Sequence, residues 1–166
     1  MVVVRLFTLR LTLLLILHAS AVAQEAAIEI KGIRVGMTKQ QLNQTIPSWS
    51  GFTIAGVPPM FHELRSPAVF HAGRLDRFVY MFLPEHFNTM HEALLEKYPA
   101  LQCKSLVKTD TVGESAESTE CGLADKDSVL LLSKYSVDRN TSLIGLYSRR
   151  YLEEEKQRKL KTKKDI

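Results

Sequence analysis

The alternation of apolar and polar positions predicts a strand followed by a short helix at the start of the folded part. Residues 28–35 (IEIKGIRV) alternate apolar and polar side chains, which is the period of a strand with one buried face. Thr38 followed three positions later by Gln41 is a capping box, the signature of a helix start. We expect this helix to end at Pro47, because proline cannot continue the helical hydrogen bonds.

An apolar strand and an amphipathic helix form the middle of the predicted fold. Residues 75–83 are apolar on both faces, as is typical of a central strand, and are expected to pair with 68–70 in a hairpin. Apolar side chains at helical spacing predict a helix over 85–98, which Pro99 ends. Further strands are predicted at 52–54, 61–64, 101–105, 119–123, 129–135 and 143–147.

The order of these elements predicts an α+β fold, in which an antiparallel β-meander sheet is covered by two helices. A helix that ends in proline and is followed by strands occurs twice, starting near Gly36 and near Pro84. The fold could therefore consist of two tandem helix–meander units. Residues 149–166 place acidic side chains four positions before basic ones, a spacing that stabilises helices, and predict a basic C-terminal helix.

One short stretch resembles a known family. Residues 32–42 (GIRVGMTKQQL) resemble the start of small exported bacterial domains related to the small outer-membrane lipoprotein of the barrel-assembly machinery. In those domains a Gly-Met-Ser/Thr turn opens a helix before a β-meander. Tandem helix–meander units also resemble the architecture of β-lactamase-inhibitor proteins. The chain lacks the lipid-anchor cysteine of the first family. The resemblance implies binding of a partner protein rather than catalysis.

The first 23 residues predict a secretory signal peptide. Arg5 and Arg10 precede an apolar block over 11–17, and Ala21-Val22-Ala23 fits the small-x-small pattern of a signal peptidase site. The apolar block is shorter than the roughly 20 residues that span a bilayer, so we expect no transmembrane segment after cleavage. The expected divisions are a signal peptide (1–23), a single α+β domain (24–148) and a basic, charged C-terminal helix or tail (149–166) in a periplasmic or secreted protein.

Charge changes the picture of possible partners. The chain has 166 residues, 22 of them Lys or Arg and 18 Asp or Glu, and a formal net charge of +4. The signal peptide contributes two positive charges and residues 149–166 contribute four, so residues 24–148 carry about −2. A slightly acidic body argues against nucleic-acid binding. The tail is expected to be either a solvated helix or a weak contact for an anionic partner or membrane face.

The candidate chemistry is structural rather than catalytic. Cys103 and Cys121 flank one polar loop in a chain sent to an oxidising compartment, and predict a cross-strand disulfide. His86 and His91 are five positions apart, which misses a shared helix face, and the chain has no His-Glu-x-x-His, Gly-x-Ser-x-Gly, P-loop or Gly-x-Gly-x-x-Gly motif. We therefore expect no metal, no cofactor and no catalytic site.

The expected function is a soluble periplasmic or secreted protein-binding module, either an inhibitor or an envelope-assembly accessory, whose partner is another envelope or secreted protein. The alternative is a small secreted hydrolase with catalytic residues on separate loops. The predicted partner-binding segment is a proline-stiffened, apolar connection between strands. Its residues are Val57, Pro58, Pro59, Met60 and Phe61. Phe61 could instead fold back into the core beneath the loop.

Overall fold

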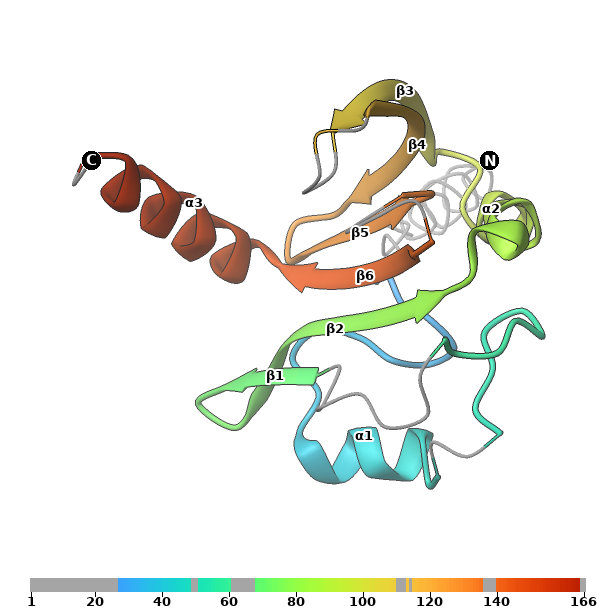
Figure 1. The fold of residues 1–166 in the computed structure, drawn as a ribbon. Helices are drawn as coiled ribbons and strands as arrows, with labels where there is room; N and C mark the ends of the chain where they lie inside the picture. Colours follow the sequence, from blue (N-terminus) through green and yellow to red (C-terminus); the bar gives the residue numbers. More distant parts are fainter. Residues whose placement is uncertain are drawn as a thin grey trace, which may run out of the picture.

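The computed structural model describes residues 27–48, 51–60, 68–109, 113, 115–135 and 140–164. Within this part of the chain, a six-stranded antiparallel sheet is combined with α-helices, which confirms the α+β prediction (Figure 1). The elements are α1 (Lys39–Thr45), β1 (Ala68–His71), β2 (Arg74–Phe82), the 3-10 helix η1 (Pro84–His86), α2 (Phe87–Lys97), β3 (Gln102–Thr109), β4 (Ser115–Ala124), β5 (Ser128–Ser133), β6 (Ser142–Ser148) and α3 (Arg149–Lys164).

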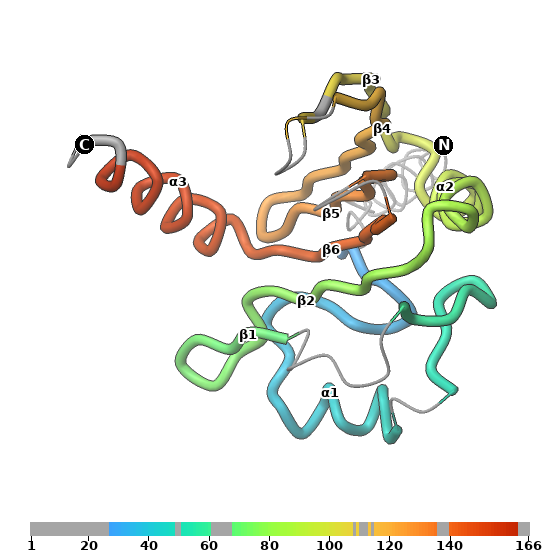
Figure 2. Tube along the Cα trace, viewed as in Figure 1, coloured from blue at the N-terminus to red at the C-terminus, as the bar shows by residue number. Residues whose placement is uncertain are grey.

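The strands are ordered β1-β2-β6-β5-β4-β3 across the sheet. Strands β3 to β6 form a continuous antiparallel meander. The β1–β2 hairpin joins it through the antiparallel pairing of β2 with β6. Helix α2 follows β2 and carries the chain to the far edge of the sheet, where β3 begins (Figure 2). A helix therefore precedes strands twice, as predicted, but both groups of strands belong to one sheet.

One face of the sheet forms the hydrophobic core. The strand register places Tyr80, Ile144, Leu132 and Cys121 side by side in one row across β2, β6, β5 and β4. These four side chains are at most 3% exposed. Helices α1 and α2 and the N-terminal segment complete the core with further apolar residues, among them Ile28, Ile30, Ile33, Leu42, Phe87, Met90 and Leu94.

The predicted strand over 28–35 is wrong. Instead, Ile30 and Ile33 hydrogen-bond to each other through both backbone groups, with N–O distances of 2.9 Å, around a tight turn. Both central residues of this turn, Lys31 and Gly32, have positive φ angles of 49° and 81°. Glycine accepts this conformation without steric strain, so the chain reverses here and the apolar positions still reach the core.

The predicted strand over 52–54 fails for the same reason. Ile54 pairs with Val57 around Ala55 and Gly56, whose φ angles are 51° and 75°. The predicted strand at 61–64 lies outside the described residues. The helix predicted over 85–98 is present as η1 and α2. The capping box of α1 is also formed, since the backbone amide of Gln41 donates to the hydroxyl of Thr38.

Helix α3 is attached to the sheet at its first turn and then leads away from it (Figure 1). The buried carboxylate of Asp76 on β2 accepts hydrogen bonds from the hydroxyl of Ser148 and the guanidinium of Arg150. On the opposite face of β2, the Arg77 guanidinium donates to the Tyr151 hydroxyl at 3.0 Å. The helix base is thus held from both faces of the sheet. No described helix is long and apolar enough to cross a membrane.

The N-terminal segment is held against the β4–β5 turn by Asp125. The carboxylate of this residue accepts from the backbone amides of Ile28 (3.0 Å), Asp127 (2.8 Å) and Ser128 (2.6 Å). Burial alone would raise the pKa of Asp125, but these amide hydrogen bonds outweigh it and hold the pKa below the ordinary value of 3.8. The charged carboxylate therefore stabilises the fold.

Asp125→Asn is expected to lower the free energy of unfolding by about 1 kcal/mol at pH 7, because Asn lacks the charge and this side chain is partly exposed. The pKa of Asp125 is lower in the folded than in the unfolded protein. The charged carboxylate therefore contributes fully to the free energy of unfolding above about pH 4, and this contribution is lost as pH falls through the folded-state pKa. The difference between wild type and variant should therefore shrink between pH 7 and pH 3. Denaturant unfolding at both pH values measures it. Asp127→Asn, in the same turn, is the control, and an equal difference at both pH values would contradict the assignment.

Candidate functional site

Within the described part of the chain, the second face of the sheet is less covered than the core face, and we call it the open face. Its side chains alternate with those of the core face, and the register places Val79, Gly145, Leu131 and Gly122 in one row. Leu131 is 37% exposed, whereas the adjacent Leu132, on the core face of the same strand, is 0% exposed. Apolar residues thus occupy both faces of the central strands, but only one face is fully covered.

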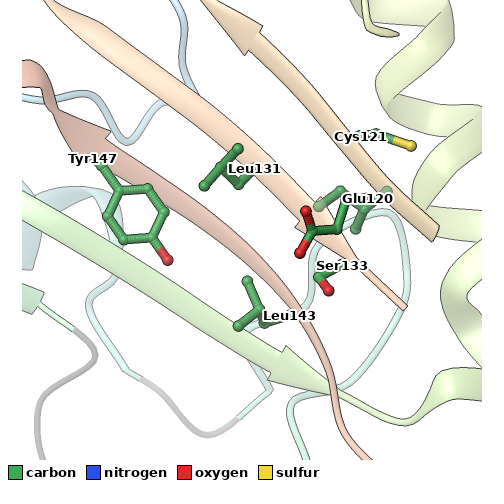
Figure 3. A pocket seen from close by; sticks show the side chains of 7 residues that line it. Glu120, Cys121, Leu131, Ser133, Leu143 and Tyr147 are labelled. Atoms are coloured by element: carbon green, nitrogen blue, oxygen red, sulfur yellow. The ribbon is translucent and has the colours of Figure 1, made fainter. Parts of the chain in front are cut away.

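A hollow of about 170 Å³ lies on this open face (Figure 3). Two glycines, Gly122 and Gly145, flank Leu131 in the register, so the sheet carries no side chains at these positions. The residues that line the hollow come from β4, β5 and β6. They are Glu120, Cys121, Leu131, Leu132, Ser133, Leu143 and Tyr147. An apolar cavity of about 150 Å³ can hold a benzene molecule, so this hollow has room for one large apolar side chain.

The ring of Tyr147 forms one wall of the hollow by lying over Gly145. A Cβ atom at position 145 would approach the Tyr147 hydroxyl and ring to 2.4 Å, so only glycine permits this ring position. Burial raises the pKa of the Tyr147 phenol. The ring also lies 6.1 Å from the ring of Tyr151, which joins this end of the hollow to the base of α3.

The other end of the hollow is acidic. Glu120 on β4 lies opposite Lys104 on β3, and their charged groups are 4.0 Å apart. The Lys104 and Glu120 side chains are 74% and 36% exposed, so solvent screens this ion pair. We refer to Glu120, Leu131, Leu143, Gly145 and Tyr147 as the open-face site.

The described part of the predicted partner-binding segment lies against β2 and is only partly available for binding. Val57 belongs to the core, since it is 2% exposed and its carbonyl accepts from the Tyr80 hydroxyl at 2.8 Å. Burial raises the pKa of Tyr80 to about 12. Pro58 is exposed, Pro59 and Met60 are half-buried, and the Met60 amide donates to the Met81 carbonyl of β2. Phe61 lies outside the described residues, so a role for 58–61 stays a prediction.

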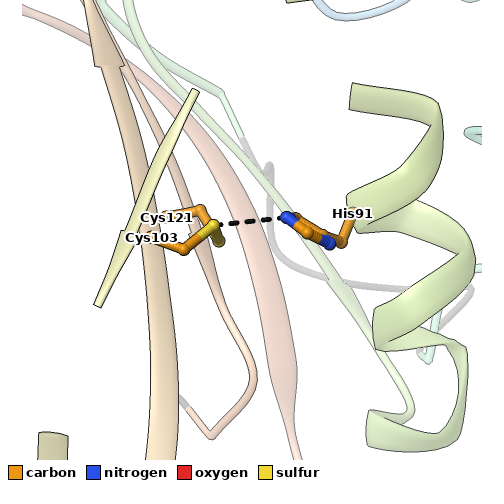
Figure 4. A group of neighbouring side chains, drawn as sticks. All are labelled: His91, Cys103 and Cys121. Atoms are coloured by element: carbon orange, nitrogen blue, oxygen red, sulfur yellow. Dashed lines mark hydrogen bonds between the residues drawn. A yellow bond between two sulfur atoms is a disulfide. The ribbon is translucent and has the colours of Figure 1, made fainter. Parts of the chain in front are cut away.

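The disulfide has a neighbour that sequence reasoning missed. Cys103 and Cys121 face each other on β3 and β4 and are joined by a disulfide, as expected. His91 of α2 points at this bond, and its Nε2 atom lies 3.2 Å from the Sγ atom of Cys103 (Figure 4). The sequence spacing of His91 from His86 does not indicate this cluster, because the two cysteines beside His91 come from β3 and β4.

The fold and the open-face site define a small α+β protein with one covered and one open sheet face. Comparison of the chain with models of protein families, with curated proteins and with solved structures gives no match. The resemblance of residues 32–42 to exported barrel-assembly domains, and that of the architecture to β-lactamase-inhibitor proteins, therefore stay predictions.

Proposed function

We propose that the protein is a non-catalytic binding module of the periplasm or of the secreted fraction, which binds another envelope or secreted protein through the open-face site. The observation that carries this proposal is the exposure of Leu131 beside a glycine-flanked hollow in the middle of a sheet. A concave site with apolar walls and a few polar groups at its rim is a typical place for an anchoring side chain of a partner. A role as an inhibitor or an envelope-assembly accessory rests on the sequence resemblance.

The expected location supports the same proposal. The first 23 residues have the pattern of a signal peptide, and the disulfide between Cys103 and Cys121 requires an oxidising compartment to form and persist. A protein partner in this compartment would meet the open face directly after export.

The site also indicates the chemistry of the partner. Leu131, Leu143 and Tyr147 offer apolar walls, so the partner should insert one aromatic or long aliphatic side chain into the hollow. The negative charge of Glu120 at one end makes the potential there more favourable for a Lys or Arg than for an acidic residue of the partner. We therefore infer a folded protein that presents an apolar anchor flanked by a basic residue.

Leu131→Arg is expected to weaken partner binding at least about tenfold, because it fills the hollow with a charged side chain at the centre of the interface. The protein is immobilised, the captured envelope partner is identified by mass spectrometry, and the affinity of the purified pair is then measured by calorimetry. Val107→Arg is the matched control, since Val107 is a 71% exposed strand residue whose register places it on the other face.

Equal binding by the two variants would contradict the open-face assignment. A chain that captures no stoichiometric partner but turns over ester, glycoside or peptide substrates would instead support the alternative, a small secreted hydrolase.

A further inference from the structure

The cluster of His91, Cys103 and Cys121 has the composition of a metal site. Its potential ligand atoms, one imidazole nitrogen and two sulfurs, all lie within 4.8 Å of one another. Two thiolates and one imidazole are soft and borderline ligands that suit Zn²⁺, and three protein ligands leave a fourth tetrahedral position open. While the cysteines are joined in a disulfide, neither sulfur is a thiolate and the set is incomplete.

We propose that, after reduction of the disulfide, His91, Cys103 and Cys121 bind one Zn²⁺ ion. This proposal is independent of the open-face site and of the proposed function. The cluster would then have a disulfide-bonded state and a metal-bound state. In the metal-bound state, the ion replaces the covalent link between β3 and β4 and also joins both strands to α2.

The scaffold holds the ligands in place without the disulfide. Cys103 and Cys121 are a directly opposed pair in an antiparallel ladder that runs from Gln102↔Gly122 to Thr109↔Ser115, and their Cα atoms are 3.9 Å apart. The two side chains therefore remain on the same face after reduction. Rotation of the side chains can separate the sulfur atoms to about 3.8 Å, the spacing that a tetrahedral site with Zn–S bonds of about 2.3 Å needs.

Helix α2 fixes the third ligand. Met90 and Leu94, which flank His91 on the helix, are 0% and 6% exposed and anchor α2 in the core. The ring of Phe87, one turn earlier, stacks against the imidazole with an interplanar angle of 9° and a centroid distance of 6.1 Å. The Nε2 atom is thereby held facing the sulfur of Cys103, as a metal ligand has to be.

A dithiol can reduce the disulfide between Cys103 and Cys121. The dithiol transfers two electrons and two protons to the disulfide, which becomes two thiols, and is itself oxidised to a disulfide. Zn²⁺ then displaces one proton from each thiol, and the neutral imidazole donates the lone pair of Nε2, so binding releases two protons to solvent. Cys103 is exposed, which leaves a path for the reductant and for the metal ion.

The test uses the full exported chain, reduced anaerobically and freed of reductant, with Zn²⁺ as the titrant and Co²⁺ as a spectroscopic probe. Reduced wild type is expected to bind one equivalent of Zn²⁺ with an apparent Kd at or below about 1 μM. Its Co²⁺ complex should show thiolate-to-metal charge-transfer absorption. The oxidised protein should bind at least about a hundredfold more weakly, because its sulfurs are not thiolates.

His91→Gln separates a metal ligand from a packing residue. This variant keeps the disulfide, so its fold is verified in the oxidised state before reduction, and it should weaken Zn²⁺ binding by the reduced chain at least about tenfold. His86→Gln, on the turn before α2 and outside the cluster, should bind like wild type. Absence of Zn²⁺ binding by the reduced wild type, loss of the native circular dichroism in the reduced Zn²⁺-bound protein, or unchanged affinity in His91→Gln would each overturn the proposal.

Discussion

Leu132→Ala is expected to lower the free energy of unfolding by about 2–5 kcal/mol, whereas Leu131→Ala should change it by less than about 1 kcal/mol. The two leucines are neighbours on β5 and point to opposite faces of the sheet. Leu132 is fully buried in the core row with Ile144 and Cys121, so its truncation leaves a cavity. Leu131 is already 37% exposed, and its truncation only widens an open hollow.

Denaturant unfolding of the two variants and of the wild type, followed by circular dichroism, measures this difference. The pair controls for residue type, strand and sequence neighbourhood, so that only the face of the sheet differs. Equal destabilisation by the two substitutions would mean that both faces are buried in solution, and the open-face site would then lose its basis.

Gly145→Ala is expected to displace the Tyr147 ring from the wall of the hollow and to lower the free energy of unfolding by about 1–3 kcal/mol. The new methyl group would lie 2.4 Å from the ring and the hydroxyl, a distance that no contact tolerates. Because the clash involves the far end of the side chain, the ring can swing away. Burial raises the pKa of Tyr147, so its exposed ring should titrate at a lower pH, closer to the ordinary value of 10.0.

Ultraviolet difference titration of the tyrosines detects this shift, and unfolding measurements give the stability change. Gly122→Ala is the matched control, because its Cβ would meet Leu131 at 3.5 Å, an ordinary contact. Gly122→Ala should therefore leave the Tyr147 titration unchanged. A Gly145→Ala variant with the stability and tyrosine titration of the wild type would show that the ring does not lie over Gly145.

The sequence predicted well those features that depend on near neighbours. The Thr38–Gln41 capping box formed as expected, because both partners lie within one helical turn. The disulfide was expected from the compartment and from the two flanking strands. The hairpin turn at Ala72–Gly73 was also expected, and its φ angles of 46° and 74° show why glycine is useful there.

The same turn chemistry was missed twice. Lys31–Gly32 and Ala55–Gly56 are also pairs of positive-φ residues between apolar neighbours, and each reverses the chain where a strand was expected. In both places, the alternation of apolar residues predicts a strand, but the glycine permits a tight turn instead. An X-Gly pair between β-branched residues was the signal that could have corrected this prediction.

What the sequence by itself determined is local: the start of α1, the amphipathic helix α2, the strands of the meander and the charged α3, because each depends on spacing within a few residues. Only the tertiary structure decided which face of the central strands is covered, since Leu131 and Leu132 are chemically identical and differ only in the direction set by the pleat. It also decided that Tyr147 lies over Gly145 and that His91 meets the disulfide. Those contacts depend on the order β1-β2-β6-β5-β4-β3 and on the path of α2 to the far edge of the sheet, which arise from burial of the whole core and not from any one segment.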